Sequence, residues 1–158
     1  MKNLKKAVIV STIIATSLSA SDFSVKLGYN NVKFGDISDS GSSISMVSSK
    51  SSKGFAYELG YIKGDKLAIT KFAGIYNWKI SNNFYIGANA GVHGINYTDN
   101  NSASETTFSG YTVGLQTKYT ITKNNSIDLS YAKGSATDDS GLVSEDLSIS
   151  SISYSYRF

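Results

Sequence analysis

Seven titratable side chains fall on the polar positions of segments in which large apolar and polar residues alternate. Because alternate side chains of a strand share one face, we predict that all seven project into a common interior. There, opposite charges can pair across a narrow space and satisfy one another. Such a set could act as an ion-selective filter or as a structural plug of ion pairs, and we favour the plug. Its members are Lys26, Glu58, Lys71, Lys79, His93, Lys118 and Asp128.

The chemistry open to these residues is limited. His93 is the only histidine, and a catalytic role would require a nucleophile and a carboxylate within hydrogen-bond reach. The chain has no cysteine and no run of carboxylates at calcium-loop spacing, so a metal site has little support. No glycine-rich phosphate loop opens a helix, because no segment after residue 20 has a helical period. We therefore expect no catalytic residue, no metal and no cofactor.

The elements that position these side chains are β-strands. Period-two alternation predicts seven strands, at residues 23–30, 55–61, 71–80, 84–93, 111–121, 127–132 and 152–158. A barrel with an even number of strands needs one more, and we place it in the weakly patterned segment 42–50. The expected fold is all-β, an eight-stranded antiparallel up-and-down transmembrane β-barrel. Alternation alone leaves open a lipocalin-like barrel with its apolar residues inside.

The last strand carries the clearest membrane signal. Ile152, Tyr154, Tyr156 and Phe158 share one face, and serines and Arg157 occupy the other. A soluble chain seldom ends on an aromatic stripe, because termini are usually solvated and frayed. A strand between lipid and a polar lumen requires this pattern. It favours the membrane barrel over the lipocalin-like one.

The N-terminus predicts export. Lys2, Lys5 and Lys6 precede a short apolar run and then small residues, which is the layout of a secretory signal peptide. We assign residues 1–20 to the signal peptide and residues 21–158 to one barrel domain. Without those three lysines the chain has 12 basic and 12 acidic residues, so its overall charge gives no support for nucleic-acid binding. No later segment has the roughly 20 apolar residues of a membrane helix.

Connector lengths predict the orientation. Residues 81–83 and 123–125 read as tight turns, and residues 99–105 and 136–145 read as longer polar loops. Outer-membrane barrels have short periplasmic turns and longer external loops, so Phe158 is predicted at the periplasmic side. The same scheme predicts an external loop at residues 35–41 and a short one at residues 63–66.

Aromatic residues cluster near the predicted strand ends, where amphipathic rings favour a membrane interface. At the periplasmic ends we predict Phe23, Trp78, Phe84 and Tyr119 in the girdle. At the outer ends we predict Tyr61, Tyr97, Phe108, Tyr111 and Tyr131.

The strand Ile86-Gly87-Ala88-Asn89-Ala90-Gly91-Val92 and the terminus Ser151–Phe158 resemble the opacity-type, porin-like small outer-membrane proteins. This resemblance implies an eight-stranded barrel in the outer membrane of a Gram-negative bacterium. It also implies recognition of the last strand, at Ile152, Tyr154, Tyr156 and Phe158, by the barrel assembly machinery. Outer-membrane lipid and lipopolysaccharide are further expected partners. A lipid A deacylase with a similar barrel has a serine two residues after its histidine, but Ile95 occupies that position here, so we expect no enzyme.

Three functions compete for such a chain. The first is a closed barrel with a structural or surface-interaction role, which displays loops to an external ligand that the sequence does not name. The second is a narrow channel for ions or very small solutes. The third is a soluble periplasmic barrel that binds an apolar ligand. We favour the first, because the interior of an eight-stranded barrel is normally filled by side chains.

Overall fold

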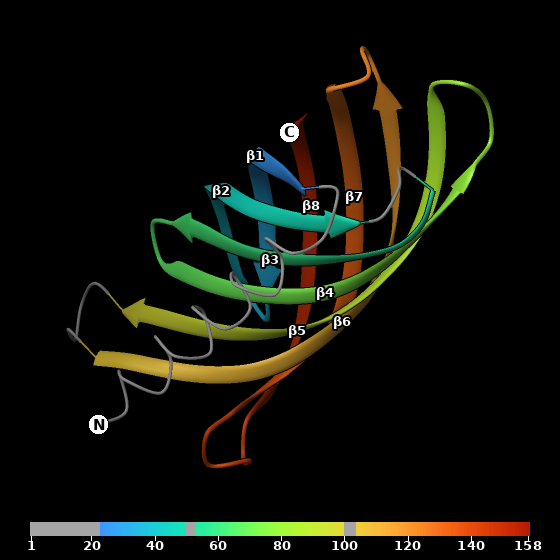
Figure 1. Cartoon of the computed structure of the whole chain (residues 1–158). Helices are drawn as coiled ribbons and strands as arrows, with labels where there is room; N and C mark the ends of the chain where they lie inside the picture. Colours follow the sequence, from blue (N-terminus) through green and yellow to red (C-terminus); the bar gives the residue numbers. More distant parts are fainter. Residues whose placement is uncertain (1–22, 50–52, 100–103) are drawn as a thin grey trace.

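The computed structural model describes residues 23–49, 53–99 and 104–158, which form a closed barrel of eight antiparallel strands in sequence order (Figure 1). The predicted fold is therefore confirmed, while the predicted signal peptide lies outside the described residues. In the described part no helix is long and apolar enough to span a membrane. The strands are β1 (Phe23–Phe34), β2 (Ile37–Ser49), β3 (Gly54–Gly64), β4 (Leu67–Lys79), β5 (Phe84–Asp99), β6 (Ser104–Thr120), β7 (Asn125–Asp138) and β8 (Ser144–Arg157).

The barrel closes between its first and last strands. β8 pairs with β7 on one side and with β1 on the other, where Tyr156 lies opposite Val25. Beyond the last pair, the Phe158 N–H donates to the Phe23 carbonyl oxygen at 2.9 Å, and the two rings stack with centroids 5.9 Å apart. Closure gives every strand two hydrogen-bonded neighbours, so the sheet has no open edge.

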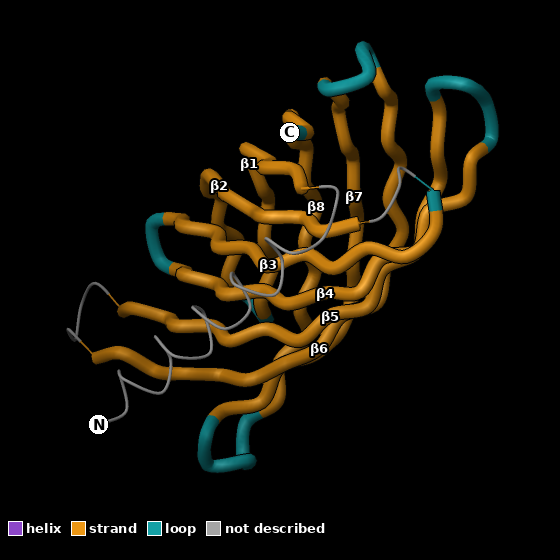
Figure 2. Tube along the Cα trace, in the orientation of Figure 1, coloured by secondary structure: helices purple, strands orange, loops and turns teal. Residues whose placement is uncertain are grey.

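The connectors divide the barrel into two ends (Figure 2). Phe23, Phe158 and the turns at residues 80–83 and 121–124 lie at what we call the terminal end. Connectors at residues 35–36, 65–66 and 139–143 lie at the opposite, far end. The two short turns predicted near residues 81–83 and 123–125 are both present at the terminal end.

The predicted loop at residues 35–41 is wrong. Only Gly35 and Asp36 form the turn, and Gly35 adopts a positive φ of 54°, which favours glycine. Residues 37–41 already belong to β2 and pair with β1, from Phe34 opposite Ile37 to Asn30 opposite Gly41. Their serines and aspartate suggested a loop, but these side chains lie on a strand that continues beyond the apolar part of the barrel.

The other far-end connectors are also shorter than predicted. The loop assigned to residues 63–66 is a two-residue turn, because Asp39 Oδ2 accepts the backbone N–H groups of Lys66 at 2.9 Å and Leu67 at 2.8 Å. The loop assigned to residues 136–145 is reduced to residues 139–143. There Asp138 Oδ1 accepts the N–H groups of Leu142 and Val143, each at 3.0 Å. Of the loop assigned to residues 99–105, residues 100–103 lie outside the described residues.

Glycines allow close approach of neighbouring strands. A Cβ at Gly134 would lie 1.7 Å from the Tyr111 carbonyl oxygen on β6, whereas a Cβ at Gly94 would meet nothing within 4 Å. The absence of a side chain is thus required at Gly134 and not at Gly94.

We predict that Gly134→Ala lowers the free energy of unfolding by about 1–3 kcal/mol, because overpacking forces β6 and β7 apart. Gly94→Ala, also a strand glycine, should change it by less than about 0.5 kcal/mol. Urea unfolding of the refolded barrel in detergent measures both values. Equal losses in the two variants would contradict the assigned role of Gly134.

Candidate functional site

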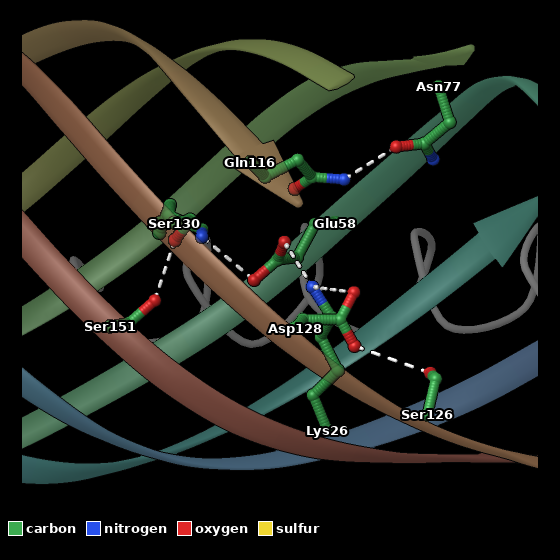
Figure 3. A network of polar contacts seen from close by, with 9 residues as sticks. Lys26, Glu58, Asn77, Gln116, Ser126, Asp128, Ser130 and Ser151 are labelled. Carbon is green, nitrogen blue, oxygen red and sulfur yellow. Dashed lines mark hydrogen bonds and ion pairs between the residues drawn. The ribbon is translucent and has the colours of Figure 1, made fainter. Parts of the chain in front are cut away.

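The lumen contains a buried layer of ion pairs built from four strands (Figure 3). Lys26 Nζ on β1 lies 3.6 Å from Glu58 Oε2 on β3 and 3.6 Å from Asp128 Oδ1 on β7. Lys71 Nζ on β4 lies 2.8 Å from Glu58 Oε1. Two ammonium groups thus face two carboxylates, and this layer has no net charge. It contains four of the seven residues predicted to face the interior.

The local sequence explains why these groups meet. Each charged residue occupies a position of its strand from which the side chain points into the lumen, and small neighbouring residues leave space for it. A Cβ at Gly60 would lie 2.5 Å from Ser45 Oγ, next to the ion-pair layer. Glu58 and Asp128 are 5% and 3% exposed, so their ammonium partners take the place of water around these two side chains. The ion-pair layer therefore fixes the relative positions of β1, β3, β4 and β7.

Neutral polar pairs extend this network across the lumen. Gln116 Nε2 donates to Asn77 Oδ1 at 2.8 Å, and the hydroxyls of Ser130 and Ser151 are 2.6 Å apart. Figure 3 shows these pairs beside the ion-pair layer, pointing into the same interior. Among the described residues, His93 Nδ1 and Thr120 Oγ1 are the buried side-chain polar atoms without a hydrogen-bond partner, so the other buried polar side chains are satisfied.

His93 is the fifth predicted residue that is buried in the lumen, at 4% exposure. Its Nε2 lies 2.7 Å from Thr112 Oγ1, and its Nδ1 has no hydrogen-bond partner among the described residues. His93 also lies opposite Lys71 in the register of β4 and β5. The side chain lines a cavity of about 30 Å³ together with Lys26, Glu58 and Lys71. Such a cavity holds one or two water molecules, which could satisfy Nδ1.

The remaining two predicted lumen residues lie towards the terminal end. Lys118 is partly buried and lies opposite Asp128 in the register of β6 and β7. Lys79 is exposed near the end of β4. The structure therefore does not bring Lys79 into the ion-pair layer.

Beyond the cavity, the far end of the lumen is filled by an apolar cluster, which we call the plug. Within the plug, Phe34 and Phe108 pack edge to face, with ring centroids 4.8 Å apart. Ile69 and Ile95 are fully buried. Ile37 and Tyr97 pack against the cluster, so all eight strands contribute to it. The buried members are Val32, Phe34, Ile62, Leu67, Ile69, Ile95, Phe108, Ala136, Leu147 and Ile149.

Sequence reasoning missed the plug, and this corrects the predicted position of Tyr97. Tyr97 and Phe108 were assigned to the outer aromatic residues, but the Tyr97 side chain points inward from β5 against the plug, and Phe108 is a buried member of the plug. The signal was present in the sequence. Val32 and Phe34 are an even number of residues from Lys26 on β1, so they point into the lumen as Lys26 does. Leu147 and Ile149 have the same relation to Ser153 on β8. At the far end, the apolar residues simply exchange faces with the polar ones.

The outward face follows the opposite pattern along the barrel axis. Between the terminal end and the plug it is apolar, and at the level of the plug it becomes polar, with Asn31, Lys33, Ser40, Lys63 and Ser148 exposed or partly exposed. We call this outward surface between the terminal end and the plug the apolar band. Its large side chains are extensively exposed, up to 66% at Leu115. The band includes Leu27, Tyr29, Phe55, Tyr57, Phe72, Tyr76, Val92, Val113, Leu115, Leu129 and Ile152.

The other predicted girdle residues lie on the outward side of the wall. Tyr61, Trp78, Tyr111, Tyr119 and Tyr131 are exposed, whereas Phe23 and Phe84 are partly buried. Trp78 joins an aromatic group on β3 and β4, and its ring centroid lies 4.9 Å from that of Tyr76.

The four residues proposed as an assembly signal form the outward face of β8. Ile152, Tyr154, Tyr156 and Phe158 are each at least 42% exposed. The Tyr154 hydroxyl donates to Asn125 on β7, and the Tyr156 and Phe158 rings pack edge to face at 5.0 Å. The stripe is thus accessible on the outer wall, directly at the seam with β1.

The described residues contain no group of three or more histidine, cysteine, aspartate or glutamate side chains able to hold a metal ion.

The fold is shared with small outer-membrane barrels of known structure. The N-terminal β-barrel domain of Pseudomonas aeruginosa OprF aligns with a TM-score of 0.60 at 17% identity, covering 84% of this chain and 97% of that one. Neisserial surface protein A aligns with a TM-score of 0.59 at 18% identity, covering 85% and 95%. Ail, the attachment invasion locus protein of Yersinia pestis, gives 0.55 at 11% identity, covering 88% and 99%. No protein-family model and no curated protein sequence matches this chain.

We predict that Glu58→Gln lowers the free energy of unfolding by about 3–5 kcal/mol, because it leaves an uncompensated buried ammonium group. The double variant Glu58→Gln/Lys71→Gln should recover part of this loss, since Lys26 then balances Asp128. Denaturant unfolding in detergent measures the difference, with Lys79→Gln as the exposed control. A double variant less stable than the single one would argue against the proposed charge balance.

Proposed function

We propose that this protein is an integral outer-membrane barrel with a closed, non-conducting lumen and a structural or surface-interaction role. The plug is the observation that carries this proposal. Ten buried apolar residues fill the far end of the lumen, and the ion-pair layer lies below them. A hydrated ion would have to cross both layers.

The apolar outward band supports a place in the membrane. Exposed apolar surface of this extent is rare on soluble proteins and is typical of membrane or partner contact. In lipid, a closed barrel satisfies all of its backbone groups internally. With the terminal end on the periplasmic side, as the orientation predicted from the sequence has it, the polar-walled far end would project outside the cell. The similar fold of the three outer-membrane proteins is consistent with this location.

The alternatives have less support. A narrow channel would need a continuous aqueous path, but the cavity that contacts the ion-pair layer has only about 30 Å³. A periplasmic barrel that binds an apolar ligand would need an empty apolar interior, whereas the plug is packed. We also expect no enzymatic activity, because His93 Nε2 is engaged by Thr112 and Ile95 occupies the position at which the barrel deacylase has its serine.

The described outer connectors are short, so the surface role would fall to the wall of the far end and not to long loops. Two of these connectors have two residues and one has five. External ligands would therefore meet strand residues and tight turns. Outer-membrane lipid and lipopolysaccharide are the expected neighbours of this wall.

Conductance tests the closed lumen. The wild-type barrel in planar lipid bilayers should give no steady openings, because the plug excludes water from the far end. A folded variant with three plug residues made small and polar, Ile69→Ser/Ile95→Ser/Phe108→Ser, should still give no steady openings, because the ion-pair layer remains intact. Heat-modifiable migration on a gel reports folding for both proteins. Discrete ohmic openings from the wild type would contradict the proposal.

Fractionation tests the location and the assembly signal. We predict that the full-length protein is recovered with the outer membrane and requires detergent for extraction. Deleting Phe158 should lower its amount there several-fold, because the barrel assembly machinery would read the terminal stripe. His93→Ala, a lumen change, should accumulate as wild type does. Equal accumulation of both variants would refute the signal, and recovery in the soluble periplasm would refute the membrane location.

A further inference from the structure

The outer wall of the far end contains a polar groove of about 590 Å³ over β1, β7 and β8. Its basic members are Lys33 and Lys133, with Ser148 between them. In the strand register Ser148 lies opposite both lysines, so the three residues form one row across β1, β8 and β7. Because adjacent strands are about 4.8 Å apart, the two lysine Cα atoms are separated by roughly 10 Å.

The two lysines are available to a ligand. Both side chains are exposed, and neither forms an ion pair within the described ranges 23–49, 53–99 and 104–158. The Lys133 ammonium lies 6.0 Å from the centroid of the Tyr131 ring, which faces the apolar band. This row therefore marks the level at which the outward face changes from apolar to charged.

The acidic members of the groove lie further from the apolar band. Asp146 is two residues beyond Ser148 towards the far end, and Asp36 belongs to the turn after β1. Glu145 also lines the groove and is close to Gly35. The Gly35 N–H donates to the Asp146 carbonyl oxygen at 2.9 Å, which holds the turn against β8. The half of the groove nearest the apolar band is thus positively charged, and the half nearest the far-end turns is negatively charged.

A second hollow, of about 460 Å³, lies on the same three strands within the apolar band. It is lined mainly by Leu27 and Tyr29 on β1, Ile127 on β7, and Ile152 and Tyr154 on β8. On the outward face of β1 and β8, a single register pair, Asn31 and Ser150, lies between the pair Tyr29–Ile152 and the pair Lys33–Ser148. The apolar hollow and the charged groove are therefore aligned along one line of the wall.

We propose that the two hollows form one lipid site, which binds a phosphoethanolamine headgroup of the surrounding bilayer. The phosphate lies at Lys33, Ser148 and Lys133, the ammonium group faces Asp36 and Asp146, and an acyl chain follows the lower hollow. A purely anionic headgroup would meet three carboxylates, and a purely cationic one would meet two lysines. A zwitterion with its phosphate on the acyl side matches both halves. This inference rests on the proposed membrane location.

Short-chain lipids test the site on the full barrel in a non-ionic detergent. Dihexanoylphosphatidylethanolamine is titrated and binding is followed by calorimetry. Dihexanoylphosphatidylglycerol, which has no ammonium group, and soluble O-phosphoethanolamine, which has no acyl chain, are the comparison ligands. The phosphatidylethanolamine should bind about tenfold tighter than either, a factor that corresponds to about 1.4 kcal/mol.

Matched variants assign the two halves of the groove. Lys33→Gln/Lys133→Gln should weaken phosphatidylethanolamine binding about tenfold. Asp36→Asn/Asp146→Asn should remove most of its advantage over phosphatidylglycerol. Lys63→Gln, an outward lysine on β3 outside this groove, should leave both affinities unchanged.

Equal or tighter binding of phosphatidylglycerol by the wild type, or equal loss in the Lys63 variant, would overturn the proposal. Binding of soluble O-phosphoethanolamine as tight as that of the lipid would overturn the role of the lower hollow. Heat-modifiable migration is read on each preparation. A folded barrel without this preference refutes the lipid site alone, whereas failure of the membrane location appears separately in the fractionation.

Discussion

The backbone pairing of β8 with β1 is the interaction on which the rest of this structure depends. Without it, both strands would expose a row of unpaired N–H and C=O groups, each costing several kcal/mol in hydrocarbon. With it, the wall has no edge and the interior is limited to the width of eight strands. That width brings Lys26 on β1 within ion-pair distance of Glu58 on β3 and Asp128 on β7. Closure thus creates both the wall and the crowded lumen.

The wall is a single sheet, so each strand must suit two environments at once. In the apolar band, the outward face of the sheet is apolar and the face that lines the lumen contains charged groups, amides and hydroxyls. At the far end the two faces exchange character, and Phe34 and Ile95 point inward while Lys33 and Asn96 point outward. The pattern of the apolar band suits a sheet whose outward face contacts lipid, and the pattern of the far end suits a sheet whose outward face contacts water. In the proposed outer-membrane location, the change of pattern would mark where the surroundings of the barrel change from lipid to water.

This exchange of faces links the proposals. The plug exists because the far end is built like the core of a soluble barrel. The lipid groove lies at the same level, where Tyr131 belongs to the apolar band and Lys133 to the polar wall. A closed lumen and a specific outer surface therefore follow from one feature of the strands. The protein would act through its wall and not through its interior.

The sequence by itself determined seven of the eight strands and which residues of each strand share a face, because a period of two is local and needs no partner strand. The eighth strand and the inward direction of Lys26, Glu58 and Asp128 were predicted from what a membrane barrel requires. The sequence did not determine the extent of β2, the length of the far-end turns or the position of Tyr97. There the apolar residues change sides, so the rule that aromatic residues face outward places Tyr97 on the wrong face. Only the tertiary structure decided which side of each strand is enclosed at each level, because that depends on how the register stacks eight strands around the axis. Ion-pair partners such as Lys71 and Glu58 were decided in the same way.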